Sequence, residues 1–466
     1  MKKLIKVLVM LFSVGALGAC ENFLEVERPI DKQVSEYVFS SDETAEAAGL
    51  GMYGSVVKYG QGAFTGLFTV YLGIVADELY ATGGYESALQ LRENRLLPEH
   101  SGASSIWLTS YETIYHVNLF LEKINRSEQV SAGLRARLAG EARFLRALFY
   151  FYLVNTYGNI PLIDSPDYHK NGSLTQSGPE VVYPFILADL EAAYDVLTPD
   201  YLLSEPVRAN KWAAAALLAR VHLFLENWSD AEKFAREVVQ KGSYALVPVD
   251  EVRLNSNAEA ILQFAQSESG LNGNYEASML LYQSSTSNRP DYAVEEGLLN
   301  AFSPEDARQD WLWEQVTTTD SVTYYLAHKY KIRWMDRNVP RTELLTVLRL
   351  GEQHLILAEA LAQQGELDGA IEQLDILRSR AGITLFNGTD VTKTKEQVLD
   401  LVMDERQREL CFELGHRWFD LNRTGRADAY FSSLPYKDWQ PTDRYFPIPQ
   451  SEILLNPFLK QNPGYE

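Results

Sequence analysis

Residues 141–163 read EARFLRALFYFYLVNTYGNIPLI, and this stretch decides the fold. Apolar residues recur here every three to four positions, a spacing that places them on one face of a helix. The face consists of Leu138, Ala142, Leu145, Phe149 and Tyr152. The positions between them are also bulky, so we expect other helices to pack around this one on most sides. Gly158 permits a left-handed turn and Pro161 prevents a restart, so the central helix should span 133–157.

The composition excludes some classes of partner. The chain has 466 residues, enough for a large core, and a formal net charge of -21. A surface this acidic argues against nucleic acid as a partner and against binding to anionic lipid by charge. The chain also carries 26 Tyr and 8 Trp, and aromatic side chains that do not fit in the core can stack on ligands.

The N-terminus has the form of a bacterial lipoprotein signal. Lysines precede a short apolar run at 7–14, which is too short to span a membrane. Small residues then lead to Cys20, as in a lipobox, where cleavage leaves an acylated cysteine as the first residue. We therefore expect a signal peptide at 1–19 and a lipid-anchored tether at 20–39. The alternative is an ordinary secretory signal with an incidental cysteine.

Only one other cysteine is present. If Cys20 carries lipid, Cys411 has no partner within the chain, so no intrachain disulfide forms. The neighbours of Cys411 are apolar and follow a helical pattern, which favours a packing role over a nucleophilic one.

Helical periodicity recurs along most of the chain. Besides the central helix, the expected helices are 42–57, 67–80, 107–124, 179–197, 211–227, 229–240, 348–364, 367–380 and 394–414. We expect 80–105 to form a polar loop. Residues 49–54 match GxGxxG by letter, but they lie inside the first helix with no strand before them, so they do not indicate a dinucleotide site.

Two helix pairs repeat each other. In the first pair Ala219 precedes Ala231 by the same spacing as Ala358 precedes Ala370 in the second. Small residues at matched positions let two antiparallel helices approach closely, as in tetratricopeptide hairpins. Ser229 is expected to cap the second helix of the first pair. The sequence therefore predicts a mainly all-α fold built on tetratricopeptide-like helix pairs.

The two pairs are separated by a long stretch with little helical periodicity. We expect 245–343 to form an inserted loop-rich lobe with short strands at 260–265 and 323–327. The helical scaffold then comprises 40–244, with a ligand-facing loop at 77–107, and 344–425. The proline-punctuated segment 426–466 should wrap around the surface.

The charged residues favour structural roles over catalysis. Residues 404–409 read DERQRE, and we expect a structural charge network of helix-surface pairs worth a few tenths of a kcal/mol each. Asp306 and Asp310 lie one helical turn apart and are expected on a solvated face. HExxH, GxSxG and P-loop motifs are missing, and the seven histidines lack metal-ligand spacing. We therefore expect no enzyme activity, cofactor or metal, although a glycosidase that uses two carboxylates, or a pure protein-binding scaffold, stays open.

Four sequence blocks in a fixed order carry a resemblance to a known family. They are 141–147 with 157–162, 356–360 with 377–382, 404–410 with 415–423, and 446–449 with 456–465. Together with the lipobox, they make the chain similar to the SusD/RagB family of outer-membrane nutrient-binding lipoproteins of Bacteroidetes. The resemblance covers nearly the whole chain after Cys20.

The resemblance implies a fold of four tetratricopeptide-like helix pairs and an irregular ligand-binding lobe. It also implies a lipoprotein at the cell exterior that acts as the lid of a SusC-like TonB-dependent transporter. Such a complex captures oligosaccharides, or peptides in the RagB branch, for import.

Ligand contacts in the family come from two stretches, which correspond here to 77–107 and 267–292. Flat aromatic rings suit the C–H faces of sugars, and carboxylates, amides and guanidinium groups suit their hydroxyls. The candidate ligand-binding residues are Asp77, Tyr80, Tyr85, Arg92, Asn94, Tyr275 and Tyr282. Trp311 and Trp313 are further candidates, although core burial fits them equally well. The first stretch lacks tryptophan before Trp107, which argues against a starch-type tryptophan arc.

Overall fold

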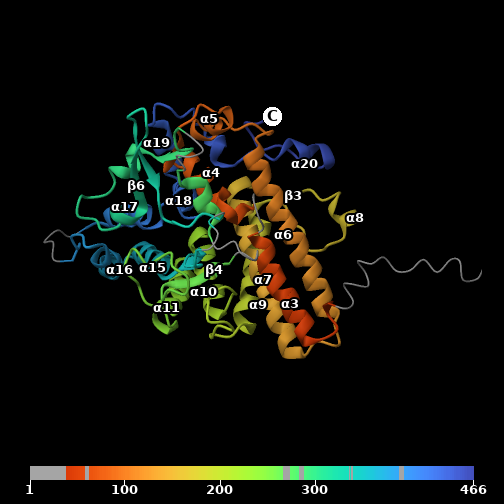
Figure 1. The fold of residues 1–466 in the computed structure, drawn as a ribbon. Helices are drawn as coiled ribbons and strands as arrows, with labels where there is room; N and C mark the ends of the chain where they lie inside the picture. The colour runs from red at the N-terminus through yellow and green to blue at the C-terminus, as the bar shows by residue number, and fades with distance from the viewer. Residues whose placement is uncertain are drawn as a thin grey trace, which may run out of the picture.

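The computed structural model of the chain describes residues 38–57, 62–265, 273–282, 288–334, 336, 339–387 and 393–466. The predicted signal peptide, Cys20 and most of the predicted tether lie outside these ranges. Helices predominate in the described part, as the sequence predicts (Figure 1). No helix among the described residues is both long enough and apolar enough to cross a membrane.

The central helix is α7, Ala132–Tyr157, and nearly all of its residues from Leu138 onward are buried. It ends at Gly158, whose φ of 72° lies in the region that favours glycine. Helices α6, Ser101–Arg126, and α9, Pro179–Val196, pack along it, and α3, Asp42–Val56, lies against α6 and α7 (Figure 1). The prediction of a helix surrounded by other helices is confirmed.

The repeated helix pairs form as predicted. They are α10, Lys211–Phe224, with α11, Trp228–Lys241, and α15, Leu350–Gln364, with α16, Leu367–Ala381. The four matched alanines are fully buried where the helices of each pair meet. Because α9 also packs on α10 and α11 on α15, the helices form a continuous stack.

Two expected boundaries in this part are wrong. Ser229 does not cap α11, because the helix begins one residue earlier, after Asn227. The last long helix, α17, runs from Lys395 to Leu410 with the expected Thr394 capping box, but it stops short of residue 414. Phe412 and Leu414 have positive φ values of 55° and 46°, so the chain turns there before α18, His416–Arg423.

The predicted loop at 80–105 contains regular structure. Strand β1, Leu79–Ala81, is followed by helix α5, Glu86–Arg92, and α6 already begins at Ser101. His100 caps α6 by accepting the backbone N–H of Ala103 at 3.2 Å. The sequence pattern does not predict either helix start, because α5 is short and polar and histidine is an unusual N-cap.

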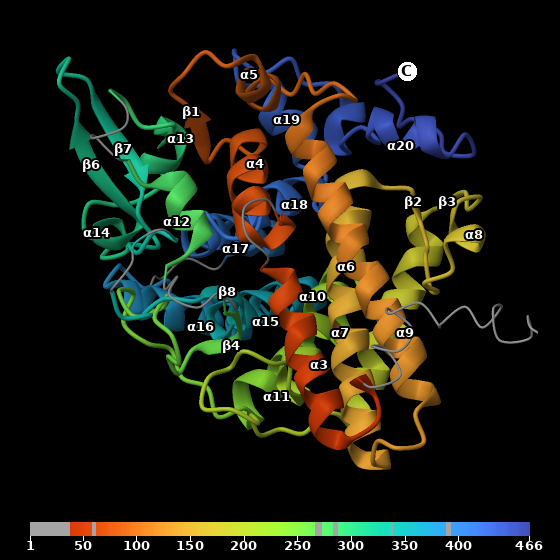
Figure 2. The ribbon, with the colours of Figure 1, turned by 45° about the vertical axis from the view of Figure 1, so that its right-hand side comes forward.

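The segment between α11 and α15 contains most of the strands. Its elements are β4 (Ala260–Phe264), α12 (Tyr275–Leu280), β5 (Tyr292–Val294), α13 (Glu296–Leu299), α14 (Gln309–Leu312), β6 (Trp313–Thr317), β7 (Thr323–Ala327) and β8 (Leu345–Arg349). The two predicted strands correspond to β4 and β7. Strand β8 takes the first two positions of the helix expected at 348–364. Antiparallel pairs join β4 to β8, β6 to β7 and β1 to β5, so the segment lies beside α4 (Phe68–Val75) and α5 (Figure 2).

The remaining elements are short, apart from α4. They are η1 (Ala63–Leu67), α4 (Phe68–Val75), β2 (Ile160–Pro161), α8 (Tyr168–Asn171), β3 (Gln176–Ser177), α19 (Ala427–Ser432), η2 (Pro441–Arg444) and α20 (Gln450–Leu455). The chain after α19 returns to the end of the central helix. There Asn462 donates from its side chain to the carbonyls of Tyr157 and Phe446, at 2.8 and 2.7 Å.

Candidate ligand-binding site

The predicted ligand residues gather around a two-stranded ribbon. Strands β1 and β5 pair antiparallel, with Tyr80 opposite Ala293 and Ala81 opposite Tyr292. Successive residues of a strand point to opposite faces, so Tyr80 and Tyr292 occupy opposite sides of the ribbon. The candidates fall into two groups, one around β1 and α5 and one in the stretch 273–282 that contains α12.

The first group is an aromatic and basic surface, which we call the tyrosine rim and define as Tyr80, Tyr85, Arg92 and Tyr436. The guanidinium group of Arg92, at the end of α5, lies 5.1 Å from the ring centroid of Tyr80 and 4.6 Å from that of Tyr436. Its Nε donates to Glu295 Oε1 at 2.8 Å, which fixes the plane of the group. Tyr85 precedes α5 and is 62% exposed. The rim thus combines an exposed tyrosine at the start of α5 with a guanidinium group that lies over two tyrosine rings at its end.

Asp77 lies behind the tyrosine rim. It is buried, with a positive φ of 68°, and its carboxylate accepts the hydroxyls of Tyr430 and Tyr436. Burial and the Asp77 carboxylate both raise the pKa of Tyr436 well above its ordinary value, so the phenol stays protonated and keeps donating. Asp77 therefore positions a rim tyrosine.

Asn94 is also buried. Its φ of 55° places it in the left-handed region, which asparagine tolerates better than most residues, and it ends the turn after α5. Its Oδ1 accepts no hydrogen bond from the described residues. The position of Asn94 is thus set by the turn, away from the exposed surface.

The second group consists of Tyr275 and Tyr282. Tyr275, the first residue of α12, packs edge-on against Trp334 with ring centroids 6.3 Å apart. Burial raises the pKa of Tyr71, with a smaller contribution from the neighbouring Tyr275. Tyr282 is half-buried at the end of the described stretch 273–282. The stretch 267–292 is only partly described, so the full surroundings of this group lie outside the described residues.

Sequence reasoning missed Tyr436 and Glu295. Tyr436 lies in the segment expected only to wrap the surface, and 359 positions separate it from Asp77. Glu295 follows β5 directly, and its pairing with Arg92 depends on how β5 lines up with β1. Local pattern carries no signal for contacts that distant.

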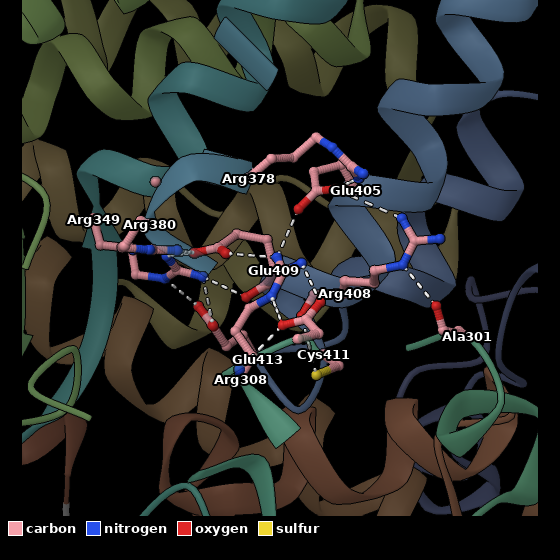
Figure 3. A network of polar contacts seen from close by, with 12 residues as sticks. Ala301, Arg308, Arg349, Arg378, Arg380, Glu405, Arg408, Glu409, Cys411 and Glu413 are labelled. Atoms are coloured by element: carbon pink, nitrogen blue, oxygen red, sulfur yellow. Dashed lines mark hydrogen bonds and ion pairs between the residues drawn. The ribbon is translucent and has the colours of Figure 1, made fainter. Parts of the chain in front are cut away.

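The charged block at 404–409 forms a buried network instead of the expected surface pairs (Figure 3). Arg349 is the centre: it bonds Glu259 at 2.8 Å, Glu409 at 2.6 Å and Glu413 at 2.8–2.9 Å. All four side chains are under 10% exposed. A structural charge network is therefore present, but the surface position expected for Glu405 and Glu409 is wrong, because both are buried where strand β8 carries Arg349 into the space beside α17. Asp404 stays exposed, 4.0 Å from Arg408.

Further arginines extend this network. Arg308 pairs with Asp306, Glu405 and Glu409, while Arg378 and Arg380 come from α16. Burial alone would raise the pKa of Glu409, but the surrounding guanidinium groups hold it well below its usual value. The carboxylate is therefore charged, and the network joins α16, α17 and β8.

Asp306 and Asp310, which are expected together on a solvated face, have different surroundings. Asp306 is buried and held by Arg308, whose Nε and Nη2 lie 2.9 and 2.7 Å from its oxygens, whereas Asp310 is exposed. The prediction of a solvated face is wrong for Asp306. The two tryptophans also differ: Trp313 packs edge-on against Phe302 at 4.9 Å, and Trp311 is 36% exposed.

Comparisons with known proteins identify the family of the chain. Residues 275–465 match a model of the SusD family, and residues 22–223 match a model described as starch-binding associating with outer membrane. Together the two matches cover most of the chain. The chain belongs to the SusD/RagB family.

Several relatives span the whole SusD/RagB chain. SusD-like protein P25 of Formosa agariphila is 25% identical, with 99% of this chain and 100% of the relative aligned. A solved laminarin-binding SusD-like protein is 25% identical and superposes with a TM-score of 0.77 over 91% of this chain and 100% of its own. A SusD superfamily protein from Bacteroides vulgatus, 20% identical, gives a TM-score of 0.79 over 91% of this chain and 99% of its own, which supports the fold.

Three histidines in this SusD/RagB chain lie on packed helices. His222, His354 and His416 are buried on their helices, and burial lowers the pKa of each, most strongly for His416, to about 4. Within the described residues, no group of three or more His, Cys, Asp or Glu side chains is arranged to hold a metal ion.

Proposed function

We propose that this protein captures oligosaccharides at the tyrosine rim and passes them to a SusC-like TonB-dependent transporter without altering them. The observation that carries the proposal is the rim itself, where Tyr85 is exposed at the start of α5 and the Arg92 guanidinium group at the end of α5 lies over the rings of Tyr80 and Tyr436. Aromatic faces bind the C–H faces of sugars, and the guanidinium group donates to their hydroxyls. The match to a family described as starch-binding and the similarity to a laminarin-binding protein support carbohydrate as the ligand class.

In this proposal Tyr80, Tyr85 and Arg92 contact the ligand, and Asp77 and Asn94 shape the surface from behind. Tyr275 and Tyr282 form a second contact region. Cys20 carries the lipid, which anchors the protein to the outer membrane with its bulk facing the cell exterior.

The binding step can be tested with purified full-length protein. We would titrate it by calorimetry with laminarin-derived, starch-derived and peptide ligands, and measure new reducing ends in the same mixtures. We expect one oligosaccharide class to bind without turnover. Peptide binding would favour a RagB-like role, and turnover that survives repurification would overturn the proposal.

A matched pair of variants tests the site. Tyr85→Ala should weaken binding roughly threefold to tenfold, the usual worth of an aromatic contact, with no fall in melting temperature. Tyr168→Ala is the control, since Tyr168 is 73% exposed on α8, away from the rim (Figure 2). Equal affinity of the natural protein and Tyr85→Ala would remove the rim from the site.

The lipid anchor and the transporter can be tested in cells. Labelled palmitate should enter the natural protein and not Cys20→Ala, which should leave the membrane fraction. A SusC-like transporter should co-purify with the anchored protein, and failure to recover one after crosslinking would contradict the delivery step.

A further inference from the structure

A solvent-accessible cavity of about 180 Å³ lies between the inserted segment and the buried charge network. An engineered cavity of roughly 150 Å³ binds benzene, so this one can admit a six-membered ring. Asp250, Trp311 and Lys331 are exposed at its mouth, and Arg253, Arg308 and Arg349 line its buried part. The cavity is separate from the tyrosine rim, since none of the rim residues lines it.

The lining is basic. Seven of the fifteen lining residues are Arg or Lys, and three are acidic. Much of this charge is already neutralised, because the carboxylates of the network bind Arg308 and Arg349. The question is therefore which cationic groups still have donors to offer.

Three lining side chains have hydrogen-bond donors that no described residue accepts. Arg253 is buried and bonds Glu413 through Nη2, but its Nε and Nη1 have no hydrogen-bond partner among the described residues. The same holds for Nε of Arg380. Lys331 forms no salt bridge with a described residue, and its Nζ lies 3.7 Å from the ring centroid of Trp311. Buried charged donors without partners are costly, so an acceptor in the cavity would relieve that cost.

The acidic lining residues limit the charge of the ligand. The Glu343 carboxylate accepts the backbone N–H groups of Lys331 and Ile332, at 2.8–3.0 Å, so it is already satisfied. Asp250 is exposed at the mouth and would repel a second negative charge. A group with a single charge fits better than a dianion.

We propose that this cavity binds the carboxylate of an acidic sugar residue, a hexuronic acid. The carboxylate accepts from Arg253 and Lys331, and the sugar ring lies against the Trp311 indole at the mouth. The choice of a sugar rests on the proposed glycan capture; the choice of a carboxylate rests on the cavity alone.

The test is a ligand-observed NMR titration of purified full-length protein with D-glucuronate, with D-glucose and N-acetylglycine as comparisons. We expect glucuronate to bind with a Kd of about 1 mM, as its size implies, and glucose to bind at least tenfold more weakly. Lack of glucuronate binding would overturn the proposal. Equal binding of N-acetylglycine would overturn the sugar assignment and leave a general carboxylate site.

Variants distinguish this cavity from other surfaces. Lys331→Gln and Arg253→Gln should each weaken glucuronate binding about tenfold, and Asp250→Asn should tighten it. Lys233→Gln is the matched control, since Lys233 is an exposed lysine over the Phe234 ring, 4.4 Å away on α11. If Arg253→Gln does not fold, Lys331→Gln and Asp250→Asn still test whether the cavity binds glucuronate. Unchanged affinity in both would refute the site.

The outcome is independent of the tyrosine rim. Tyr85→Ala should leave glucuronate binding unchanged, and Lys331→Gln should leave neutral oligosaccharide binding unchanged. Failure of glucuronate binding with intact oligosaccharide binding would therefore reject the cavity proposal alone, and the reverse result would reject the rim alone.

Discussion

Replacing Arg146 should destabilise the protein far more than replacing an exposed arginine nearby. Arg146 projects from the central helix to Asp189 on α9, with Nε–Oδ2 and Nη2–Oδ1 distances of 2.7 and 2.8 Å. Its Nη1 donates to Asn118 on α6 at 2.7 Å, so one side chain joins three helices. Both members of the ion pair are at most 10% exposed.

The expected magnitude follows from the carboxylate that Arg146→Met would strand. Breaking a buried pair by removing one partner costs about 3–5 kcal/mol, because the other charge stays buried without compensation. Burial already raises the pKa of Asp189, and Arg146 opposes that rise, so the pKa should climb further in the variant. A carboxyl group whose pKa is raised in the folded state lowers the stability once the pH exceeds the pKa of that group in the unfolded chain. The loss of stability in Arg146→Met should therefore be larger at pH 7 than at pH 4.

Urea unfolding followed by circular dichroism at both pH values provides the measurement. Arg126→Met is the control, because Arg126 pairs with Glu122 on the surface of α6 at 3.0 Å and should cost about 0.5 kcal/mol or less. The double variant Arg146→Met with Asp189→Leu should recover most of the loss. Equal losses for Arg146→Met and Arg126→Met, or a loss independent of pH, would refute the reasoning.

Three other changes give simpler tests. A Cβ on Gly102 would lie 2.0 Å from the Tyr71 ring, so Gly102→Ala should lower the free energy of unfolding by about 1–3 kcal/mol. Gly133 has open space around it, so Gly133→Ala should raise the free energy of unfolding by up to about 1 kcal/mol. Equal denaturation midpoints for the two variants would contradict this expectation. Burial raises the pKa of Glu276 to about 7, so the stability of the protein falls as the pH rises from about 4.5 to 7. In urea unfolding, the gain in stability from Glu276→Gln should therefore be about 3 kcal/mol larger at pH 8 than at pH 5. A gain that is the same at both pH values would contradict the raised pKa. Cys411 is buried and its pKa is raised to about 12, so iodoacetamide should alkylate the Cys411 peptide only in urea, as mass spectrometry would show. Alkylation of the native protein would show that the thiol is not buried.

The sequence predicts the helical scaffold well because the relevant signals are local. The central helix is apolar on most sides, and Gly158 marks its end, so a 3.6-residue period and one turn residue suffice. The matched alanines reveal the helix pairs for the same reason, since close packing of neighbouring helices needs small residues at fixed spacing.

The charge network and the rim depend on contacts that local pattern does not encode. Glu409 reads as one charge in a polar block, and its burial follows only from the approach of β8 and α16. Tyr436 joins Arg92 because the chain after α19 passes beside α5. Propensity and spacing therefore predict the type of the elements, and tertiary contact decides which polar residues are buried.

The antiparallel pairing of β4 with β8 has a consequence for how this chain can change. The two strands are buried along their whole length, and they close the long stretch of chain between Phe264 and Leu345 at its base. The entropic cost of a closed loop grows only slowly with its length, so the stretch can be lengthened, shortened or exchanged while the base stays paired. The strand pair holds both ends of the stretch in place, so its loops can change as long as Arg308 still reaches Glu405 and Glu409 of α17.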